Sequence, residues 1–379
     1  MKILIAAESF LPRSNGVTNT VMRAANYLRE HNHEVLIVAP GEGPEIIGDQ
    51  RVVRVPAISF NTRVTIDIAA VTASRLREVI RGFKPDIVHL ASPYLLGGQV
   101  RKAASYLGVP VVAVYQTDVS GFASFYGLGL IKGLAEKRIR KIHSSSDLNL
   151  APSTSSIKFL NSLGVNNVKL WTRGVDHEIF SPKLRSDSLR KTWNAKRESF
   201  VIGFVGRLAP EKQVENLLAL RGIESLFARD IKFVIIGDGP SKKKLSELLP
   251  NAIFAGYLSG RDLGRAMASL DLLITTGENE TFCQVVQEAM AAAVPVIAPR
   301  SGGPIDLVKE SITGKLYQPG NLRDLRRAVI SMIADPNAAA EMGMSGQREV
   351  QNRSWSNVCA ELVVHYQNVL ASRGLQEIA

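Results

Sequence analysis

The chain has 379 residues, of which 45% are hydrophobic and 21% charged, and its formal net charge is +11 at pH 7. This length exceeds one ordinary hydrophobic core, and the composition excludes a disordered chain, so we expect two folded domains. Two cysteines, Cys283 and Cys359, are too few for a disulfide framework and fit a reducing compartment. No run approaches the ~20 apolar residues that span a bilayer, and Glu8 ends the apolar start of the chain too early for a signal peptide.

Strands and helices alternate along the whole chain, which is typical of α/β domains with parallel sheets. The strands expected in the first domain are Lys2–Ala7, Glu34–Ala39, Arg51–Val55, Ile87–Leu90, Val111–Tyr115 and Leu148–Ala151. A second domain is expected to begin near Ser199. Its first two strands are expected in the segments Phe200–Lys212 and Phe233–Pro240, each followed by a glycine turn, and its further strands are Asn251–Ala255, Asp271–Thr275 and Val294–Ala298.

A basic segment runs from Ile131 to His143, where cations alternate with apolar residues in a helical pattern. The stretch before it, Gly121–Leu130, is rich in aromatic residues and glycine. Together they fit an interfacial segment on an anionic membrane surface, although an ordinary surface helix with an apolar inner side fits equally well. Nucleic acid is rejected as the partner because no aromatic-basic platform or binding motif accompanies the charge. The cations of the segment are Lys132, Lys137, Arg138, Arg140 and Lys141.

Two segments are expected to join the domains. Trp171–Pro182 contains the glycine, aspartate and proline of a crossover linker, and a last helix is expected from Ser354 to Leu370.

The segment Phe200–Lys212 reads as a buried strand followed by a glycine turn and a helix. This order places Gly206, Arg207 and Lys212 at the carboxyl end of a strand, where open α/β sheets bind ligands. Two cations at such a place fit a diphosphate, with arginine as the forked donor and lysine as the point charge.

A second candidate site lies around Glu280 and Glu288, eight positions apart with a helical pattern between them. We expect Thr281 or Asn279 to cap this helix, which leaves backbone N–H groups of its first turn for an anion. The residues that carry these N–H groups are Phe282, Cys283 and Gln284. Taken alone, the stretch also fits an ordinary amphipathic helix with solvated glutamates.

With these motifs the chain resembles the retaining GT-B glycosyltransferases of glycosyltransferase family 4, over nearly its whole length. Within that family it is most similar to actinobacterial GDP-mannose-dependent α-mannosyltransferases that act on glucuronosyl diacylglycerol or phosphatidylinositol mannosides. Phe122, Tyr126 and Tyr115–Val119 favour the glucuronosyl-lipid group. The markers of the family are Gly203–Lys212, the pair Glu280 and Glu288, Ala293–Ala298, Gly302–Pro304, and Arg173–Asp176 with Phe180.

The resemblance implies a GT-B fold, in which two Rossmann-like α/β domains with parallel sheets face a central cleft. It assigns residues 1–180 to an acceptor-binding domain, 181–353 to a nucleotide-sugar-binding domain, and 354–379 to a helix that crosses back to the first domain. It makes Trp171–Pro182 the hinge about which the domains close over the substrates.

The reaction implied is transfer of mannose from GDP-mannose to a membrane glycolipid, without metal or other cofactor, at the inner face of the cell membrane. The acceptor expected is glucuronosyl diacylglycerol, in glycolipid or lipoglycan synthesis. The alternatives are a UDP-sugar-dependent glycolipid glycosyltransferase of the glucosyl or sulfoquinovosyl type, and a phosphatidylinositol-mannoside mannosyltransferase. A nucleotide-sugar epimerase and a non-catalytic lipid- or nucleotide-binding protein are further alternatives.

The resemblance also assigns roles in binding the donor. Arg207 and Lys212 offset charge on the leaving diphosphate, Glu280 holds sugar hydroxyls and Glu288 holds the ribose. In the loop Leu11–Val17, the family usually has two glycines where this chain has Asn15 and Gly16. The loop either closes over the phosphates of the nucleotide or is a plain turn between strand and helix. The donor-binding residues expected are Asn15, Gly16, Gly206, Arg207, Lys212, Tyr257, Leu258, Glu280, Phe282, Cys283, Gln284 and Glu288.

On the acceptor side, Gln116 stands where the family usually has histidine, and a glutamine cannot act as a general base. Asp118 either takes the proton of the acceptor hydroxyl or only accepts its hydrogen bond. His89 either lines the acceptor site or is a structural histidine. The catalytic residues expected are therefore Arg207, Lys212, Glu280 and Asp118.

Overall fold

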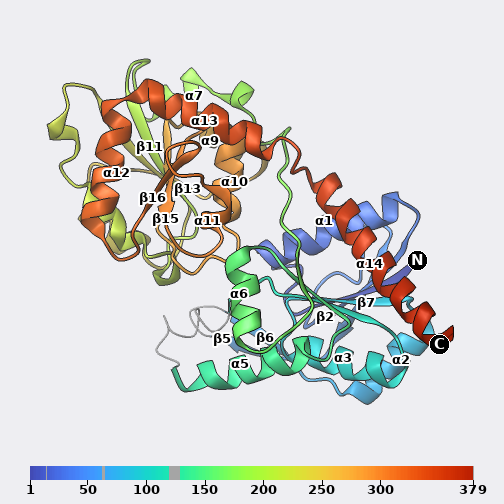
Figure 1. Ribbon diagram of the computed structural model, residues 1–379. Helices are drawn as coiled ribbons and strands as arrows, with labels where there is room; N and C mark the ends of the chain where they lie inside the picture. Colours follow the sequence, from blue (N-terminus) through green and yellow to red (C-terminus); the bar gives the residue numbers. More distant parts are fainter. Residues whose placement is uncertain (14, 62–64, 119–128, 379) are drawn as a thin grey trace. The chain divides into compact units, whose positions relative to one another are not determined.

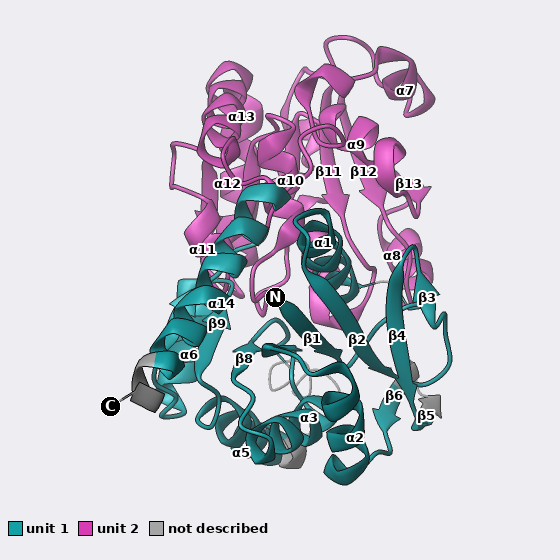
Figure 2. Cartoon of the chain, turned by 90° about the vertical axis from the view of Figure 1, so that its right-hand side faces the viewer, with its two compact units in different colours: residues 1–173, 355–379 teal, residues 174–354 magenta. Residues whose placement is uncertain are grey.

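The computed structural model describes residues 1–13, 15–61, 65–118 and 129–378 (Figure 1). The chain forms two compact units, Met1–Arg173 with Trp355–Ala379 and Gly174–Ser354, which Figure 2 shows in two colours. The division expected after residue 180 lies a few residues earlier, because Val175 and Phe180 are buried in the core of the second unit.

Unit 1 contains an eight-stranded sheet in the order β10-β9-β8-β7-β1-β2-β4-β3. All of its strand pairs are parallel except β3 with β4. A separate antiparallel ribbon of β5 (Ala57–Asn61) and β6 (Thr65–Ala69) was not predicted. The strands of the sheet are β1 (Lys2–Ala7), β2 (Glu34–Pro40), β3 (Ile46–Ile47), β4 (Gln50–Val55), β7 (Ile87–Ala91), β8 (Val111–Val114), β9 (Leu148–Ala151) and β10 (Val168–Leu170).

Both faces of this sheet are covered, so its central strands are apolar throughout. Helices α1 (Gly16–Glu30) and α14 (Trp355–Ile378) bury one face, and α2 (Ala73–Phe83) and α3 (Leu95–Tyr106) bury the other. Trp171 Nε1 donates to the carbonyl of Val358 in α14 at 2.9 Å. The remaining helices of unit 1 are α5 (Gly129–His143) and α6 (Thr154–Ser162).

Unit 2 contains a six-stranded parallel sheet in the order β13-β12-β11-β14-β15-β16. One face packs against α9, α10 and α11, and the other against α8, α12 and the 3₁₀ helix η3 (Val214–Leu220). The strands are β11 (Phe200–Val205), β12 (Ile231–Ile236), β13 (Ile253–Gly256), β14 (Leu272–Ile274), β15 (Val296–Pro299) and β16 (Gly314–Tyr317). The helices are α7 (Asp187–Thr192), α8 (Lys242–Leu248), α9 (Gly260–Ala268), α10 (Gln284–Ala291), α11 (Pro304–Leu307), α12 (Leu322–Ala334) and α13 (Pro336–Val350).

These two sheets confirm the α/β prediction of two Rossmann-like domains with parallel sheets. One local prediction was wrong: the segment after Gly206 continues as short 3₁₀ helices, η2 (Pro210–Lys212) and η3, rather than an α-helix. Gln213 between them adopts the left-handed conformation with φ 46°, which interrupts regular helix. No helix in the described ranges has the length and apolarity that a bilayer crossing requires.

Candidate functional site

Two loops at the carboxyl edge of the unit 2 sheet are bonded to each other through their backbones. Leu208 N donates to Asp238 O at 2.9 Å, and Gly206 N donates to Ile236 O at 3.0 Å. Gly237 lies between them with φ 145°, and a Cβ there would lie 1.9 Å from the carbonyl oxygen of Gly206. Only glycine fits such a contact, so the loop that carries Arg207 and Lys212 is fixed before any ligand arrives.

Lys212 and Glu280 form an ion pair, Lys212 Nζ with Glu280 Oε1. The two side chains are 32% and 18% exposed, and the hydroxyl of Thr276 donates to the carbonyl of Lys212 at 2.7 Å. Burial alone lowers the pKa of Lys212, but the Glu280 carboxylate outweighs it, and the pKa is raised. The lysine therefore stays cationic, beside the carboxylate expected to hold a sugar.

Arg207 lies in the same loop and is more exposed. Its Nη1 lies 3.4 Å from Glu211 Oε1, and the guanidinium is 40% exposed. Both predicted cations, Arg207 and Lys212, thus lie on one loop. Of these two, within the described residues, Lys212 is the one that contacts Glu280.

The loop that carries Glu280 is supported from behind by two glycines. Gly303 N donates to Glu280 O at 2.7 Å, and Ser301 Oγ donates to Glu278 O at 2.8 Å. A Cβ on Gly302 would lie 2.4 Å from Glu280 O, and one on Gly303 would lie 2.4 Å from Phe282 Cα. This close approach of backbone to backbone explains why the chain has glycine at both positions.

The predicted helix between the two glutamates is wrong in its start and its cap. α10 begins at Gln284, so Glu280 lies in the preceding loop and only Glu288 lies on the helix. Neither Thr281 nor Asn279 caps it: the N-cap is Cys283, which has φ 70° and forms no side-chain cap. The backbone of Gly302 and Gly303 packs against residues 280–282 and holds the loop before the helix.

This irregular start still suits an anion. A left-handed residue followed by helical residues turns successive N–H groups toward one point, which is an anion-binding arrangement. Cys283 supplies that left-handed residue, with Phe282 and Cys283 buried. Burial raises the pKa of the Cys283 thiol to about 12, so it stays protonated and contributes through its backbone.

Gln284 and Glu288 occupy different surroundings on α10. The side chain of Gln284 donates from Nε2 to the carbonyl of Gly174 at 2.9 Å, where the chain enters unit 2. Glu288 is half-buried one turn further along the helix. The side chain of Gln284 is thus engaged within unit 2, and the predicted role of its backbone N–H is unaffected.

The predicted donor-binding residues Tyr257 and Leu258 follow β13, next to the loop after β12. Gly237 N donates to Gly256 O at 2.7 Å, and Gly256 has φ 76°. Tyr257 is 72% exposed, whereas Leu258 packs against the core. A large exposed aromatic ring at this edge of the sheet is available to a flat ligand.

In unit 1, Asn15 caps α1. Its Oδ1 accepts from Val17 N at 2.9 Å and from Thr18 N at 3.0 Å. The carbonyl of Gly16 accepts from Arg173 Nη1 at 3.2 Å, and a Cβ on Gly16 would lie 2.9 Å from that nitrogen. The side chain of Asn15 therefore caps α1, as the alternative of a plain strand-to-helix turn expects.

The predicted acceptor residues follow β8. Gln116 is buried and its Oε1 accepts from Arg173 Nη2 at 3.3 Å. Asp118 is half-buried and its Oδ1 accepts from Tyr115 Oη at 3.3 Å. Arg173 thus joins Gln116 to Gly16, a link that no local pattern indicated, although the arginine stands in the hinge motif.

His89 is a core residue rather than part of an acceptor site. It is buried, and its Nδ1 lies 2.6 Å from Tyr366 Oη of α14, with the ring of Trp171 edge-on at 6.2 Å. Burial lowers the pKa of His89 to about 3, so it stays neutral. The prediction that it lines the acceptor site is wrong, because a helix distant in sequence covers it.

The basic segment forms α5, whose inner side is buried through Ala135, Ile139 and Ile142. One predicted membrane contact is engaged elsewhere: Arg138 Nε donates to the carbonyl of Tyr94 at 2.9 Å. Leu134 is 68% exposed on the outer side of the helix. The exposed cations of α5 are Lys132, Lys137, Arg140 and Lys141. Phe122, Tyr126 and most of Gly121–Leu130 lie outside the described residues.

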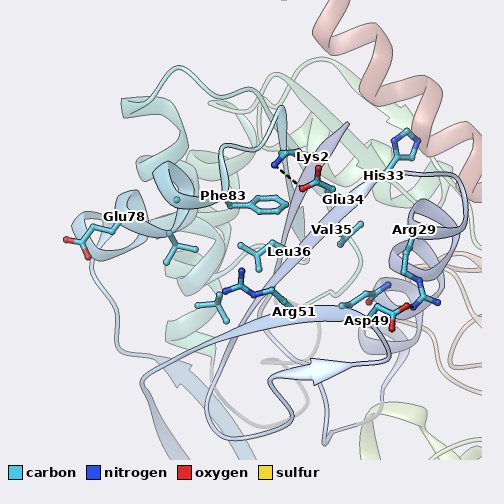
Figure 3. Close-up of a pocket in the computed structure, with 14 residues that line it drawn as sticks. Lys2, Arg29, His33, Glu34, Val35, Leu36, Asp49, Arg51, Glu78 and Phe83 are labelled. Carbon is cyan, nitrogen blue, oxygen red and sulfur yellow. Dashed lines mark hydrogen bonds and ion pairs between the residues drawn. The ribbon is translucent and has the colours of Figure 1, made fainter.

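Unit 1 also contains a cavity of about 790 Å³ between α2 and the amino ends of the strands (Figure 3). Its cations Lys2 and Arg29 are paired with Glu34 at 2.9 Å and Asp49 at 3.1 Å. It lies at the end of the sheet opposite to Asn15, Gln116 and Asp118, so it is separate from the predicted acceptor residues. Among the described residues, no group of three or more His, Cys, Asp or Glu side chains is placed to hold a metal ion.

Comparisons with known proteins cover both units. Residues 14–179 match the family described as Glycosyltransferase Family 4, and residues 185–349 match Glycosyl transferases group 1. The chain is 46% identical over 383 residues to a GDP-mannose-dependent alpha-mannosyltransferase of Mycolicibacterium smegmatis, covering 99% of this chain and 100% of that protein. A Corynebacterium glutamicum protein of the same description is 42% identical over 376 residues, covering 98% and 90%. In fold the chain is similar to an Anabaena protein solved in complex with UDP, with TM-score 0.78, 19% identity, and 97% and 100% of the two chains covered.

Proposed function

From the premise that this chain belongs to glycosyltransferase family 4 and has the GT-B fold, we propose that it transfers mannose from GDP-mannose to a membrane glycolipid. The proposal includes retention of the anomeric configuration and no requirement for a metal. The donor rests on the similarity, along the full length of the chain, to relatives described as GDP-mannose-dependent. The observation that supports the site is the ion pair of Lys212 with Glu280, because a cation and a carboxylate side by side suit the diphosphate and the sugar hydroxyls of one donor.

In this proposal the donor binds to unit 2. Lys212, Arg207 and the N–H groups at the start of α10 offset the charge that develops on the leaving diphosphate. Glu280 accepts hydrogen bonds from mannose hydroxyls, and Glu288 accepts from the ribose. The bonded loops after β11 and β12 hold the backbone near Arg207, and Gly303 holds the loop of Glu280, so little reorganisation is needed when the donor binds.

The acceptor binds to unit 1, beside Gln116 and Asp118. Since Gln116 cannot take a proton, the leaving phosphate receives the proton of the acceptor hydroxyl on the same face of the sugar. Asp118 accepts the hydrogen bond of that hydroxyl and orients it. Attack from the side of the leaving group retains the configuration of the sugar.

We infer further that the acceptor is glucuronosyl diacylglycerol at the inner face of the cell membrane, with the protein in the cytoplasm. The exposed cations of α5 would contact the anionic lipid surface, with Leu134 beside them. A paired assay tests the acceptor, with glucuronosyl and glucosyl diacylglycerol at equal concentration in the same vesicles. A much higher rate on the uronic acid supports the proposal; equal rates contradict it, and a preference for phosphatidylinositol mannosides favours the other acceptor.

The donor is tested by thermal unfolding of the purified protein with GDP, UDP, ADP, GDP-mannose and UDP-glucose. A ligand at about 100 times its dissociation constant adds about 2.7 kcal/mol of stability, enough to rank the bases without an acceptor. Stabilisation by GDP and GDP-mannose supports the proposed donor. Stabilisation by UDP alone would assign the chain to the UDP-sugar alternative.

A further inference from the structure

The hydroxyl of Tyr94 is buried in unit 1 and has no hydrogen-bond partner among the described residues. Leaving a buried polar group without a partner costs free energy, and phenylalanine would pack the same ring without that cost. A tyrosine at this position therefore needs a reason beyond packing.

The backbone of Tyr94 is held from both sides. Its N–H donates to Glu8 Oε1 at 2.5 Å, and its carbonyl accepts from Arg138 Nε at 2.9 Å. Glu8 also accepts from Leu96 N at 3.1 Å and Gly97 N at 2.8 Å, at the start of α3. With its backbone fixed, the freedom left to Tyr94 is the rotation of its side chain.

That side chain lies beside the predicted acceptor residues. Its ring packs against the cluster that contains Tyr115, whose hydroxyl donates to Asp118. Ser92 Oγ donates to Thr117 Oγ1 at 3.0 Å, which joins the loop of Tyr94 to the loop of Asp118. Burial, together with the charges of Glu8 and Asp118, raises the pKa of Tyr94 to about 12, so the phenol remains a donor.

We propose that Tyr94 is a positioning residue for Asp118: as the acceptor binds, the phenol of Tyr94 turns to donate a hydrogen bond to the carboxylate. With Tyr115 and Tyr94 as donors, the carboxylate of Asp118 is held in one orientation toward the acceptor hydroxyl. This inference rests on the proposed transfer to an acceptor on unit 1. It explains the unpartnered phenol as a group whose partner is complete only in the reacting complex.

The test compares Tyr94→Phe with the wild type and with Tyr106→Phe, a control at the exposed end of the same helix, where Tyr106 stacks on Arg77. Initial rates are measured with GDP-mannose and vesicles containing glucuronosyl diacylglycerol, each substrate varied in turn. We expect Tyr94→Phe to lower kcat/KM for the acceptor about tenfold, the effect of one hydrogen bond to a charged group. The KM for the donor should be unchanged. The melting temperature should be unchanged or slightly higher.

Three results would overturn the inference. An unchanged acceptor kcat/KM for Tyr94→Phe would show that Tyr94 does not act on Asp118. Equal losses for both substrates with a lower melting temperature would show a structural role only. A wild type that transfers no mannose to the glycolipid would remove the proposed function and this inference together, whereas an active wild type with the first or second result removes the inference alone.

Discussion

The replacement Lys212→Met tests the centre of the proposed donor site. Methionine keeps most of the length of the lysine stem. This length matters because the Cδ of Lys212 packs beside Gly277. The change therefore removes the charge while it preserves the packing of the stem. It also removes the cation that forms an ion pair with the Glu280 carboxylate.

The expected effects on turnover and on stability differ in size. Loss of one donor to transition-state charge lowers kcat about 100-fold to 1,000-fold, or about 2.7–4 kcal/mol. The ion pair is 32% and 18% exposed, and solvent screening limits its loss to about 1 kcal/mol of stability. For a unit of this size that shifts the melting temperature by about 2–4 °C.

The assay measures initial rates with saturating GDP-mannose and vesicle-bound glycolipid, together with thermal unfolding. The matched control is Lys244→Met, which breaks an ion pair to Glu215 of 2.8 Å on the surface of the same unit. The control variant should keep the turnover of the wild type and lose about as little stability as Lys212→Met. If Lys212→Met turns over as fast as the wild type, the assignment of this lysine to the diphosphate is wrong.

Three further outcomes are expected. Gly237→Ala forces a Cβ to within 1.9 Å of the Gly206 carbonyl and should lower the melting temperature by several degrees, with loss of GDP binding by calorimetry. His89→Leu should lower stability at pH 7 but reduce the further loss between pH 7 and pH 5 by about 2 kcal/mol in urea titrations. The unfolded histidine binds its proton below pH 6.5, whereas the folded one, with its pKa lowered to about 3, does not. The double change Lys137→Glu with Lys141→Glu should reduce co-sedimentation with anionic vesicles about tenfold or more at 0.1 M salt and leave neutral vesicles unaffected.

Each of these has a result that contradicts it. Gly237→Ala with unchanged melting would show that the two loops separate without cost. His89→Leu with the pH dependence of the wild type would place the titration on another group. For α5 the control is charge reversal at Lys191 and Lys243 in unit 2; if both double variants lose vesicle binding equally, net charge rather than α5 accounts for it.

The sheets could be predicted because their central strands are continuous apolar runs, and in unit 2 the runs of β11 and β12 are followed by glycine turns. The same runs located Gly206, Lys212 and Glu280 at one sheet edge. The local structure around Glu280 could not be predicted, since it depends on the backbone of Gly302 and Gly303 packing behind the loop. Helical periodicity carries no sign of that contact, or of the left-handed Cys283.

The acceptor side was less predictable for a related reason. His89 was expected near the end of an apolar strand, where ligand-binding residues lie, but it is the middle residue of β7 and its partner Tyr366 comes from α14. Arg173 and Arg138 read as charges in a hinge and on a basic helix, but both bind within unit 1. In each case the deciding contact joins residues far apart in the sequence.

The placement of α14 also determines the order in which the protein can fold during synthesis. Val358, Leu362 and Tyr366 belong to the same core as strands β1 and β7, so residues 1–173 leave the ribosome with only α1 on that face of their sheet and the part under α14 uncovered. All of unit 2 is made before the covering helix emerges, and unit 2 can therefore finish folding first. The incomplete sheet is a natural substrate for chaperones in that interval, and a chain cut before Trp355 should aggregate. Supplying residues 355–379 as a separate peptide should restore solubility to the 1–173 fragment.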